Sequence, residues 1–136
     1  MKIFSAAQIR EADEFTIKYE PIKSINLMER ASKAFVDWFT VNFDKSRRIF
    51  IFCGTGNNGG DGMAIARMLT FKKWKVKTYT VRKSSKRSQD FTINYLKLAE
   101  VRQIMDISNS ENLSLGIEEN DIIIDAIFGS GLARPV

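Results

Sequence analysis

The sequence predicts an α/β protein whose strands form a mostly parallel sheet. The apolar run at 49–52 and the segment 121–125, which has three isoleucines between two aspartates, are too short for helices and are predicted to be buried parallel strands. A strand at 74–81 and a short one at 101–105 alternate with segments of helical character. Such alternation favours right-handed connections between parallel strands.

Length and composition indicate one domain, here residues 1–136. The 136 residues include 44% apolar residues, which is enough for a real core. Histidine is absent, which excludes histidine-based zinc sites, Ser-His triads and imidazole acid-base chemistry. The single cysteine, Cys53, ends a buried strand and is interpreted as an inert thiol.

The charge and hydropathy patterns bear on partners and location. A net charge of +5 suits an anionic ligand such as a nucleotide and allows weak attraction to nucleic acid. No apolar run approaches the roughly 20 residues of a membrane span, and the first residues turn polar too quickly for a signal peptide. We therefore expect a cytoplasmic protein without a membrane segment.

Two helices are expected before the first strand. Ser5 and Gln8 form a capping-box pattern, which predicts a helix from Ala6 that ends before Pro21. Its apolar face would comprise Ile9, Ala12, Phe15 and Tyr19. Asn26 with Glu29 predicts the start of the second helix. Its apolar stripe, which is typical of a core or a subunit interface, comprises Met28, Ala31, Phe35, Trp38 and Phe39. A later helix is expected at 89–99.

The stretch GTGNNGGDG at 54–62 is the strongest candidate for a ligand site. Gly54, Gly56 and Gly59 satisfy G-x-G-x-x-G directly after a strand and before a helix expected from Asp61 onward. Glycines allow positive φ and close approach, and the helix start attracts an anion. The motif is longer than a turn requires, which favours a ligand.

Plainer interpretations of the same stretch stay open. The Asp61 carboxylate could serve only to cap the helix. Asn57 and Asn58 could serve only to form a left-handed turn.

Asn58 and Asp125 each follow or end a predicted strand. If the two strands are neighbours, an amide oxygen and a carboxylate oxygen converge at the carboxyl edge of the sheet, where ligands bind in such folds. With loop carbonyls these oxygens would make a hard-cation site. Alternatively, Asp125 satisfies backbone N–H groups of the next loop.

The end of the 74–81 strand departs from the usual NAD pattern. Where an acidic residue would hold the ribose hydroxyls, the chain reads Val81, Arg82, Lys83. This ending could accommodate a 2′-phosphate, or it could mean that the ligand binds in another pose.

Taken together, several stretches resemble the YjeF N-terminal domain family, the NAD(P)H-hydrate epimerases. They are GTGNNGGDG at 54–62, DAIFGSGLARPV at 125–136, and AAQIREADEFTI with INLMERAS in the first two helices. The resemblance spans essentially the whole chain. It implies a Rossmann-like three-layer αβα fold, usually homodimeric, that epimerises the R and S forms of hydrated NADH or NADPH.

The resemblance also implies roles for individual residues. The hydrated dinucleotide, NAD(P)HX, would contact Asn57, Asn58, Gly59, Gly60 and Asp61. Its phosphates would lie against Gly129, Ser130, Gly131, Leu132, Ala133, Arg134 and Pro135. Asn58 and Asp125 would bind a potassium ion. A cation-bound Asp125 would be a poor base, so Asp61 is the better candidate for acid-base catalysis.

Members of that family continue past the second glycine turn, through a strand that ends in an Asp-x-Pro-Ser-Gly turn. We therefore expect residues 1–136 to form an incomplete domain with an open sheet edge and with weak or no activity alone. In many bacteria the parent chain also carries a C-terminal ADP- or ATP-dependent dehydratase domain.

Two other functions remain open at this stage. An NADP-dependent dehydrogenase would explain GTGNNG and Arg82, but not the remainder of the motif or the second glycine turn. A non-catalytic nucleotide- or RNA-binding scaffold would use the basic run at 72–87, which has interleaved aromatic residues. Such a run is more often the solvated face of an edge strand, so nucleic acid is not the favoured partner.

Overall fold

The computed structural model describes residues 3–20, 22–82, 85–108 and 113–129. The helices are α1 (Ala6–Tyr19), α2 (Ser24–Asn42), α3 (Asn57–Phe71) and α4 (Gln89–Ala99). The strands are β1 (Arg48–Cys53), β2 (Lys75–Thr80), β3 (Ile104–Asp106) and β4 (Ile122–Ala126). The strands pair in the order β3-β2-β1-β4, and every pair is parallel. The α/β fold with a parallel sheet is therefore confirmed.

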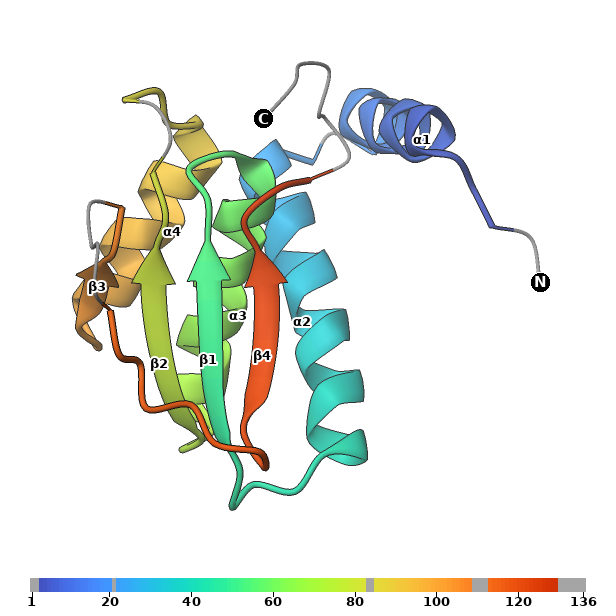
Figure 1. Cartoon of the computed structure of the whole chain (residues 1–136). Coiled ribbons are helices and arrows are strands. Elements are labelled where there is room, and N and C mark those ends of the chain that lie inside the picture. Colours follow the sequence, from blue (N-terminus) through green and yellow to red (C-terminus); the bar gives the residue numbers. More distant parts are fainter. Residues whose placement is uncertain (1–2, 21, 83–84, 109–112, 130–136) are drawn as a thin grey trace.

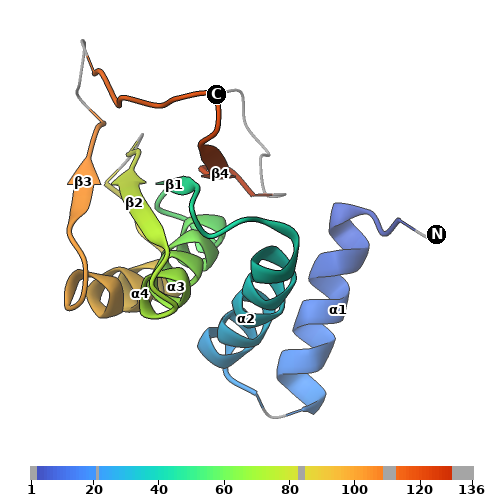
Figure 2. The ribbon, with the colours of Figure 1, turned by 90° about the horizontal axis from the view of Figure 1, so that it is seen from below.

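The helices α2, α3 and α4 lie on one face of the sheet (Figures 1 and 2). The opposite face is crossed by the segment 113–121, which we call the strap. Within the described residues the molecule thus has one sheet and one layer of helices. No described helix is long and apolar enough to cross a membrane.

The core lies between the sheet and α3. Alternate residues of β1 point to the helical face, so Ile49, Ile51 and Cys53 are fully buried there. Gly62 brings α3 against the sheet, because a Cβ at this position would lie 2.7 Å from both Cys53 Sγ and Ala126 Cβ. A larger residue would push the helix away from the strands that carry the glycine-rich loop.

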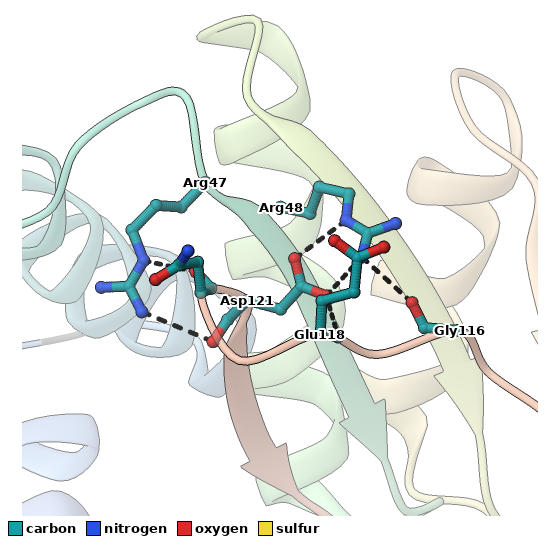
Figure 3. A network of polar contacts seen from close by, with 6 residues as sticks. Arg47, Arg48, Gly116, Glu118 and Asp121 are labelled. Carbon is teal, nitrogen blue, oxygen red and sulfur yellow. Dashed lines mark hydrogen bonds and ion pairs between the residues drawn. The ribbon is translucent and has the colours of Figure 1, made fainter.

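The strap is fastened at the amino ends of β1 and β4 by a polar network (Figure 3). Arg48 donates from Nε and Nη2 to the two carboxylate oxygens of Asp121, at 2.8 and 2.6 Å. Nη2 also donates to the Gly116 carbonyl at 3.0 Å, and Arg47 Nε donates to the Asn120 carbonyl at 2.6 Å. The network holds the strap over the face of the sheet on which Phe50 is fully buried.

The predicted starts of the first two helices have different outcomes. The capping box of α1 is present: Gln8 N donates to Ser5 Oγ at 3.3 Å, and Ser5 N donates to Gln8 Oε1 at 2.9 Å. The predicted start at Asn26 is wrong. α2 begins two residues earlier, at Ser24. Glu29 serves another purpose, because it accepts a 2.5 Å hydrogen bond from Arg67 of α3.

The predicted apolar stripe of α2 is wrong in part. Met28 and Phe39 are buried, but Trp38 is 55% exposed, and the buried line runs through Met28, Ser32, Val36 and Phe39. Phe39 fixes the rotation of the helix, because its ring packs edge-on against buried Trp74 at 5.3 Å and stacks on Phe43 at 4.6 Å.

The helix α1 stands apart from the sheet (Figures 1 and 2). No residue of α1 is buried, and its predicted apolar face leaves Phe15 61% and Tyr19 60% exposed. The two rings pack on each other at 4.3 Å. An ion pair between Glu20 and Arg30, at 3.2 Å, joins the end of α1 to α2.

The prediction that the basic run at 72–87 marks an edge strand is wrong. β2 lies between β3 and β1, and in the described sheet the edges are β3 and β4. Trp74, Val76 and Tyr79 are buried, so the aromatic residues of this run belong largely to the core. Lys75 and Lys77 alternate with them and stay exposed.

Candidate functional site

The two glycine-containing segments begin side by side at the carboxyl edge of the sheet. β1 and β4 are hydrogen-bonded neighbours, with Cys53 opposite Ala126. Gly54 N donates to the Ala126 carbonyl at 3.0 Å, so the pairing continues into both loops. The strand that precedes Asn58, β1, and the strand that contains Asp125, β4, are therefore neighbours, as the site prediction required.

The helix α3 starts earlier than the sequence predicts. Its first residue is Asn57 rather than Asp61, and Gly60 N donates to the Gly56 carbonyl at 3.0 Å. Asn57 and Asn58 are helical, and among the described residues positive φ occurs only at Lys73 and Gly116, so the left-handed-turn interpretation is wrong. Asp61 lies in the second turn and does not cap the helix.

The glycines are required by close contact between backbones. A Cβ on Gly54 would lie 2.0 Å from the Ile127 carbonyl oxygen, and one on Gly59 would lie 1.8 Å from the Gly54 carbonyl oxygen. Gly56 is the N-cap residue of α3, and no side chain caps the start of this helix. Its first N–H groups and the positive end of its dipole therefore face the edge of the sheet, where they favour an anion.

Asn58 connects the two loops. Its Nδ2 donates to the Phe128 carbonyl at 2.9 Å, and the position of a Cβ on Gly129 would be 3.2 Å from Asn58 Cβ. Since the amide nitrogen is used in this way, the amide oxygen Oδ1 is the atom left for a ligand.

Asp125 is exposed near the carboxyl end of β4. Its Oδ1 accepts a 2.9 Å hydrogen bond from Ile127 N, so the carboxylate does satisfy one backbone N–H of the next loop. Within the part of the chain that the structure describes, the second oxygen, Oδ2, takes part in no hydrogen bond or ion pair. Of the predicted contact residues in the second loop, only Gly129 is described, and Ser130 to Pro135 lie outside the described residues.

Asp61 is partly buried in α3 and has an unusual protonation equilibrium. Burial raises the pKa of its carboxyl to about 6, and the negative charges of Asp13 and Asp90 act in the same direction. The Ser32 hydroxyl lowers this pKa by a smaller amount. Ser32 Oγ is buried and, within the described residues, forms no hydrogen bond of normal geometry, so its stabilisation of the carboxylate is weak.

Sequence reasoning missed two residues that shape this region. Thr55 Oγ1 donates to the Lys86 carbonyl at 2.8 Å, and its own carbonyl accepts from Ser88 N at 2.9 Å. The segment that follows β2 is thereby tied to the glycine-rich loop. Ser32 was missed because polar residues in an amphipathic helix are normally assigned to its exposed side. The only signal for Thr55 was its place inside the glycine motif.

These features define a class: a parallel α/β protein in which an uncapped, glycine-rich start of a helix lies beside a second loop. The family described as "YjeF-related protein N-terminus" matches residues 24–136. The chain belongs to this family.

Individual relatives agree with that assignment. The chain is 39% identical over 132 residues to an NAD(P)H-hydrate epimerase of Limosilactobacillus fermentum. The aligned region covers 97% of the chain and 61% of that protein. It is 32% identical over 138 residues to a bifunctional NAD(P)H-hydrate repair enzyme of Moorella thermoacetica, covering 96% of the chain and 26% of the enzyme.

A solved structure shows the same fold. The crystal structure of yeast ynu0 superposes with a TM-score of 0.75 at 23% identity, covering 100% of the chain and 60% of the yeast protein. The chain thus spans about three fifths of the length of the single-function relatives that it matches.

Proposed function

We propose that this chain forms the dinucleotide-binding part of an NAD(P)H-hydrate epimerase, which interconverts the R and S forms of hydrated NADH or NADPH. The observation that carries the proposal is the contact between the glycine-rich start of α3 and the loop after β4 through Asn58 and Phe128. The names of the relatives supply the substrate class.

The phosphates of the substrate would bind where backbone N–H groups converge. The uncapped start of α3 presents such groups together with the positive end of the helix dipole. Asn57, Gly59 and Gly60 belong to this first turn. Gly129 and residues 130–135 are proposed as further contacts of the phosphates. The contacts at Gly54 and Gly59 leave no room for side chains beneath the ligand.

A potassium ion fits the donor atoms present at this edge. Asn58 offers Oδ1 because Nδ2 is engaged, and Asp125 offers the oxygen that does not accept from Ile127. These atoms, with loop carbonyls, form the all-oxygen set that hard cations prefer. In the described residues no cluster of three or more Asp, Glu, His or Cys side chains is placed to hold a metal ion, so the donors proposed here are an amide oxygen, one carboxylate oxygen and loop carbonyls. When bound, the ion would supply positive charge beside the phosphates.

The reaction requires the C–O bond of the hydrate to break and water to return to the opposite face of the ring. The ring nitrogen stabilises the iminium-like intermediate, so the protein must mainly move a proton to and from the departing oxygen. Asp61, whose pKa is raised to about 6, is protonated and ionised in comparable amounts near pH 6, and about a tenth of it is still protonated at pH 7. A group with this pKa is suited to act as both acid and base, an effect usually worth about 10² to 10⁴ in rate.

Assembly and location complete the proposal. The exposed apolar residues of α1 and α2, among them Phe15 and Trp38, are consistent with a homodimer. The bifunctional relatives suggest a dehydratase domain in the parent chain. We place the protein in the cytoplasm, where nicotinamide dinucleotides are used.

The test is direct. The protein is mixed with the purified S or R form of hydrated NADH and NADPH, in potassium and in sodium buffer, and interconversion is followed by chromatography. We expect epimerisation above the spontaneous rate in potassium buffer for a form of the protein at least as long as the curated relatives. Absence of epimerisation in such a form, with salt-sensitive RNA binding instead, would favour the scaffold function.

A further inference from the structure

The segment after β2 lies beside the proposed dinucleotide site. β2 pairs with β1, and Thr80 is opposite Cys53 at their carboxyl ends. Val81 N donates to the Cys53 carbonyl at 2.9 Å, and Thr55 makes its two hydrogen bonds to Lys86 and Ser88. The backbone of this segment is therefore fixed against the glycine-rich loop at both of its ends.

The described part of this segment is basic. It contains Arg82, Lys86 and Arg87, and no described residue between 81 and 88 is acidic. The Arg87 guanidinium lies 5.6 Å from the Tyr95 ring, so Arg87 is directed over α4. Lys86 is exposed, and its ammonium group forms no ion pair or hydrogen bond with the described residues.

Arg82 is held in place by its neighbours at the end of β3. Its guanidinium pairs with the Asp106 carboxylate, and its backbone N–H donates to Ser108 Oγ at 2.6 Å. Asp106 also accepts from Ser108 N at 3.0 Å and from Ser108 Oγ at 2.7 Å. The Asp106 carboxylate is thus engaged by Arg82 and Ser108.

These contacts determine which ribose the edge can recognise. When a dinucleotide places its phosphates on the helix that follows the first strand, the adenosine ribose lies at the end of the neighbouring strand. A carboxylate there accepts the 2′ and 3′ hydroxyls of NAD, whereas cationic side chains accept the 2′-phosphate of NADP. Among the described residues 81, 82 and 85–88, the segment after β2 offers cations and no carboxylate, and Asp106 is engaged.

We propose that Lys86, with Arg82 beside it, binds the 2′-phosphate of the substrate, so that hydrated NADPH is preferred over hydrated NADH. This inference rests on the proposed function for the identity of the substrate. The ammonium group of Lys86 is the main contact. Arg82 is a weaker one, because Asp106 neutralises part of its charge.

The test compares the two hydrates as substrates of the same variants, in a form of the protein that contains the whole matched region. Replacement of one exposed cation that contacts a dianion should lower kcat/KM for hydrated NADPH about five- to tenfold. We expect this loss in Lys86→Ala, with kcat/KM for hydrated NADH unchanged and with recovery in Lys86→Arg. The matched control is Lys45→Ala. It removes an exposed lysine that precedes β1, at the amino ends of the strands and away from the proposed site.

A binding measurement separates this inference from the epimerase proposal. Adenosine 2′,5′-bisphosphate and 5′-AMP differ only in the 2′-phosphate, and their affinities are measured by calorimetry with each variant. If the wild-type protein prefers the bisphosphate and this preference falls in Lys86→Ala, the 2′-phosphate site is supported. This holds even if the protein epimerises no hydrate, because a lack of epimerisation would overturn only the epimerase proposal. Equal affinity of the wild-type protein for the two probes, or an unchanged preference in Lys86→Ala, would overturn the 2′-phosphate site.

Discussion

Asn58 Nδ2 donates to the Phe128 carbonyl oxygen at 2.9 Å, which joins the first turn of α3 to the loop after β4 across 70 positions of the chain. One amide side chain therefore sets the distance between the two loops that are proposed to enclose the substrate. Its nitrogen maintains the contact while its oxygen remains available to a cation. Structure and proposed function converge on this residue.

A comparison of Asn58→Ala with Asn58→Asp should separate the role of the amide nitrogen from that of the amide oxygen. The alanine variant loses the hydrogen bond and the ligand oxygen, and it should be about 1 kcal/mol less stable. The aspartate variant retains an oxygen but cannot donate to the Phe128 carbonyl, so it should lose similar stability while retaining more of the response to potassium. Chemical denaturation gives the stability, with exposed Asn57→Ala as the control. Unaltered stability in both Asn58 variants would contradict the proposed role of the contact.

The glycine-rich loop provides a matched pair of substitutions. Gly59→Ala places a Cβ 1.8 Å from the Gly54 carbonyl oxygen, whereas a Cβ on Gly56 meets no atom within 4 Å. We expect Gly59→Ala to cost about 2–4 kcal/mol of folding free energy, because the start of α3 must move. Gly56→Ala should cost about 1 kcal/mol or less, since an alanine caps the helix less well. Similar unfolding midpoints for the two variants would refute the close-contact explanation.

The raised pKa of Asp61 predicts how stability depends on pH. The folded state binds the proton more tightly than the unfolded state, so stability is highest while Asp61 is protonated and falls as the pH rises from about 4 to about 6. Asp61→Asn removes this penalty, and it should stabilise the protein by about 1–2 kcal/mol at pH 7.5, allowing for partial exposure. Little difference should remain at pH 4, and thermal denaturation at both pH values measures it. A loss of stability at pH 7.5 would mean that the ionised carboxylate is favourable in the folded state.

The same pKa predicts the pH profile of catalysis. If Asp61 transfers the proton, kcat/KM should change near pH 6, and Asp61→Asn should lose about 10² to 10⁴ in rate despite its greater stability. Ser32→Ala removes the hydroxyl that lowers this pKa, so the inflection should move to higher pH. Asp90→Asn removes a nearby negative charge and should move it to lower pH. A profile that is unaffected by all three substitutions would assign the proton transfer to another group.

Local sequence patterns predicted where most helices and strands lie, but they predicted poorly which face of the helix α2 is buried. The bounds of α4 and the start of α1 follow from caps and short-range periodicity, which are properties of neighbouring residues. The burial of Ser32 and the exposure of Trp38 depend on how α2 is turned by Phe39 against Trp74, a contact between distant segments. Likewise, α3 begins in a glycine-rich turn with poor helix propensity, because the close approach of backbones at Gly54 and Gly59 outweighs that propensity.

For the candidate site, the sequence proposed the residues but could not predict their hydrogen bonds. The site prediction required the strand before Asn58 and the strand that contains Asp125 to be neighbours, and the pairing of β1 with β4 meets this condition. That Asn58 would bind Phe128, and that Thr55 would hold Lys86, depends on loop conformations that no short pattern encodes. Coordination by Asp125 remains a prediction.

The strap supplies a last prediction, which concerns the open face of the sheet. Arg48 holds both carboxylate oxygens of Asp121, and this contact keeps the pKa of Asp121 below its usual range. Arg48→Lys retains the charge but can form only one such bond at a time, so the strap should loosen over Phe50. We expect a lower Tm at pH 7 and faster amide exchange in residues 113–121, with Arg47→Lys as the control, since Arg47 contacts only backbone carbonyls in the strap (Figure 3).

The pH dependence of this effect follows from the sign of the shift. A lowered pKa in the folded state means that the contribution of the Arg48–Asp121 pair is present above the ordinary pKa of an aspartate and is lost as the pH falls through the folded-state value. The difference in Tm between the wild-type protein and Arg48→Lys should therefore shrink under strongly acidic conditions, where Asp121 is neutral in both proteins. A difference that persists unchanged in acid would show that Arg48 acts through its packing over the Phe50 ring, 5.5 Å away, and not through the ion pair.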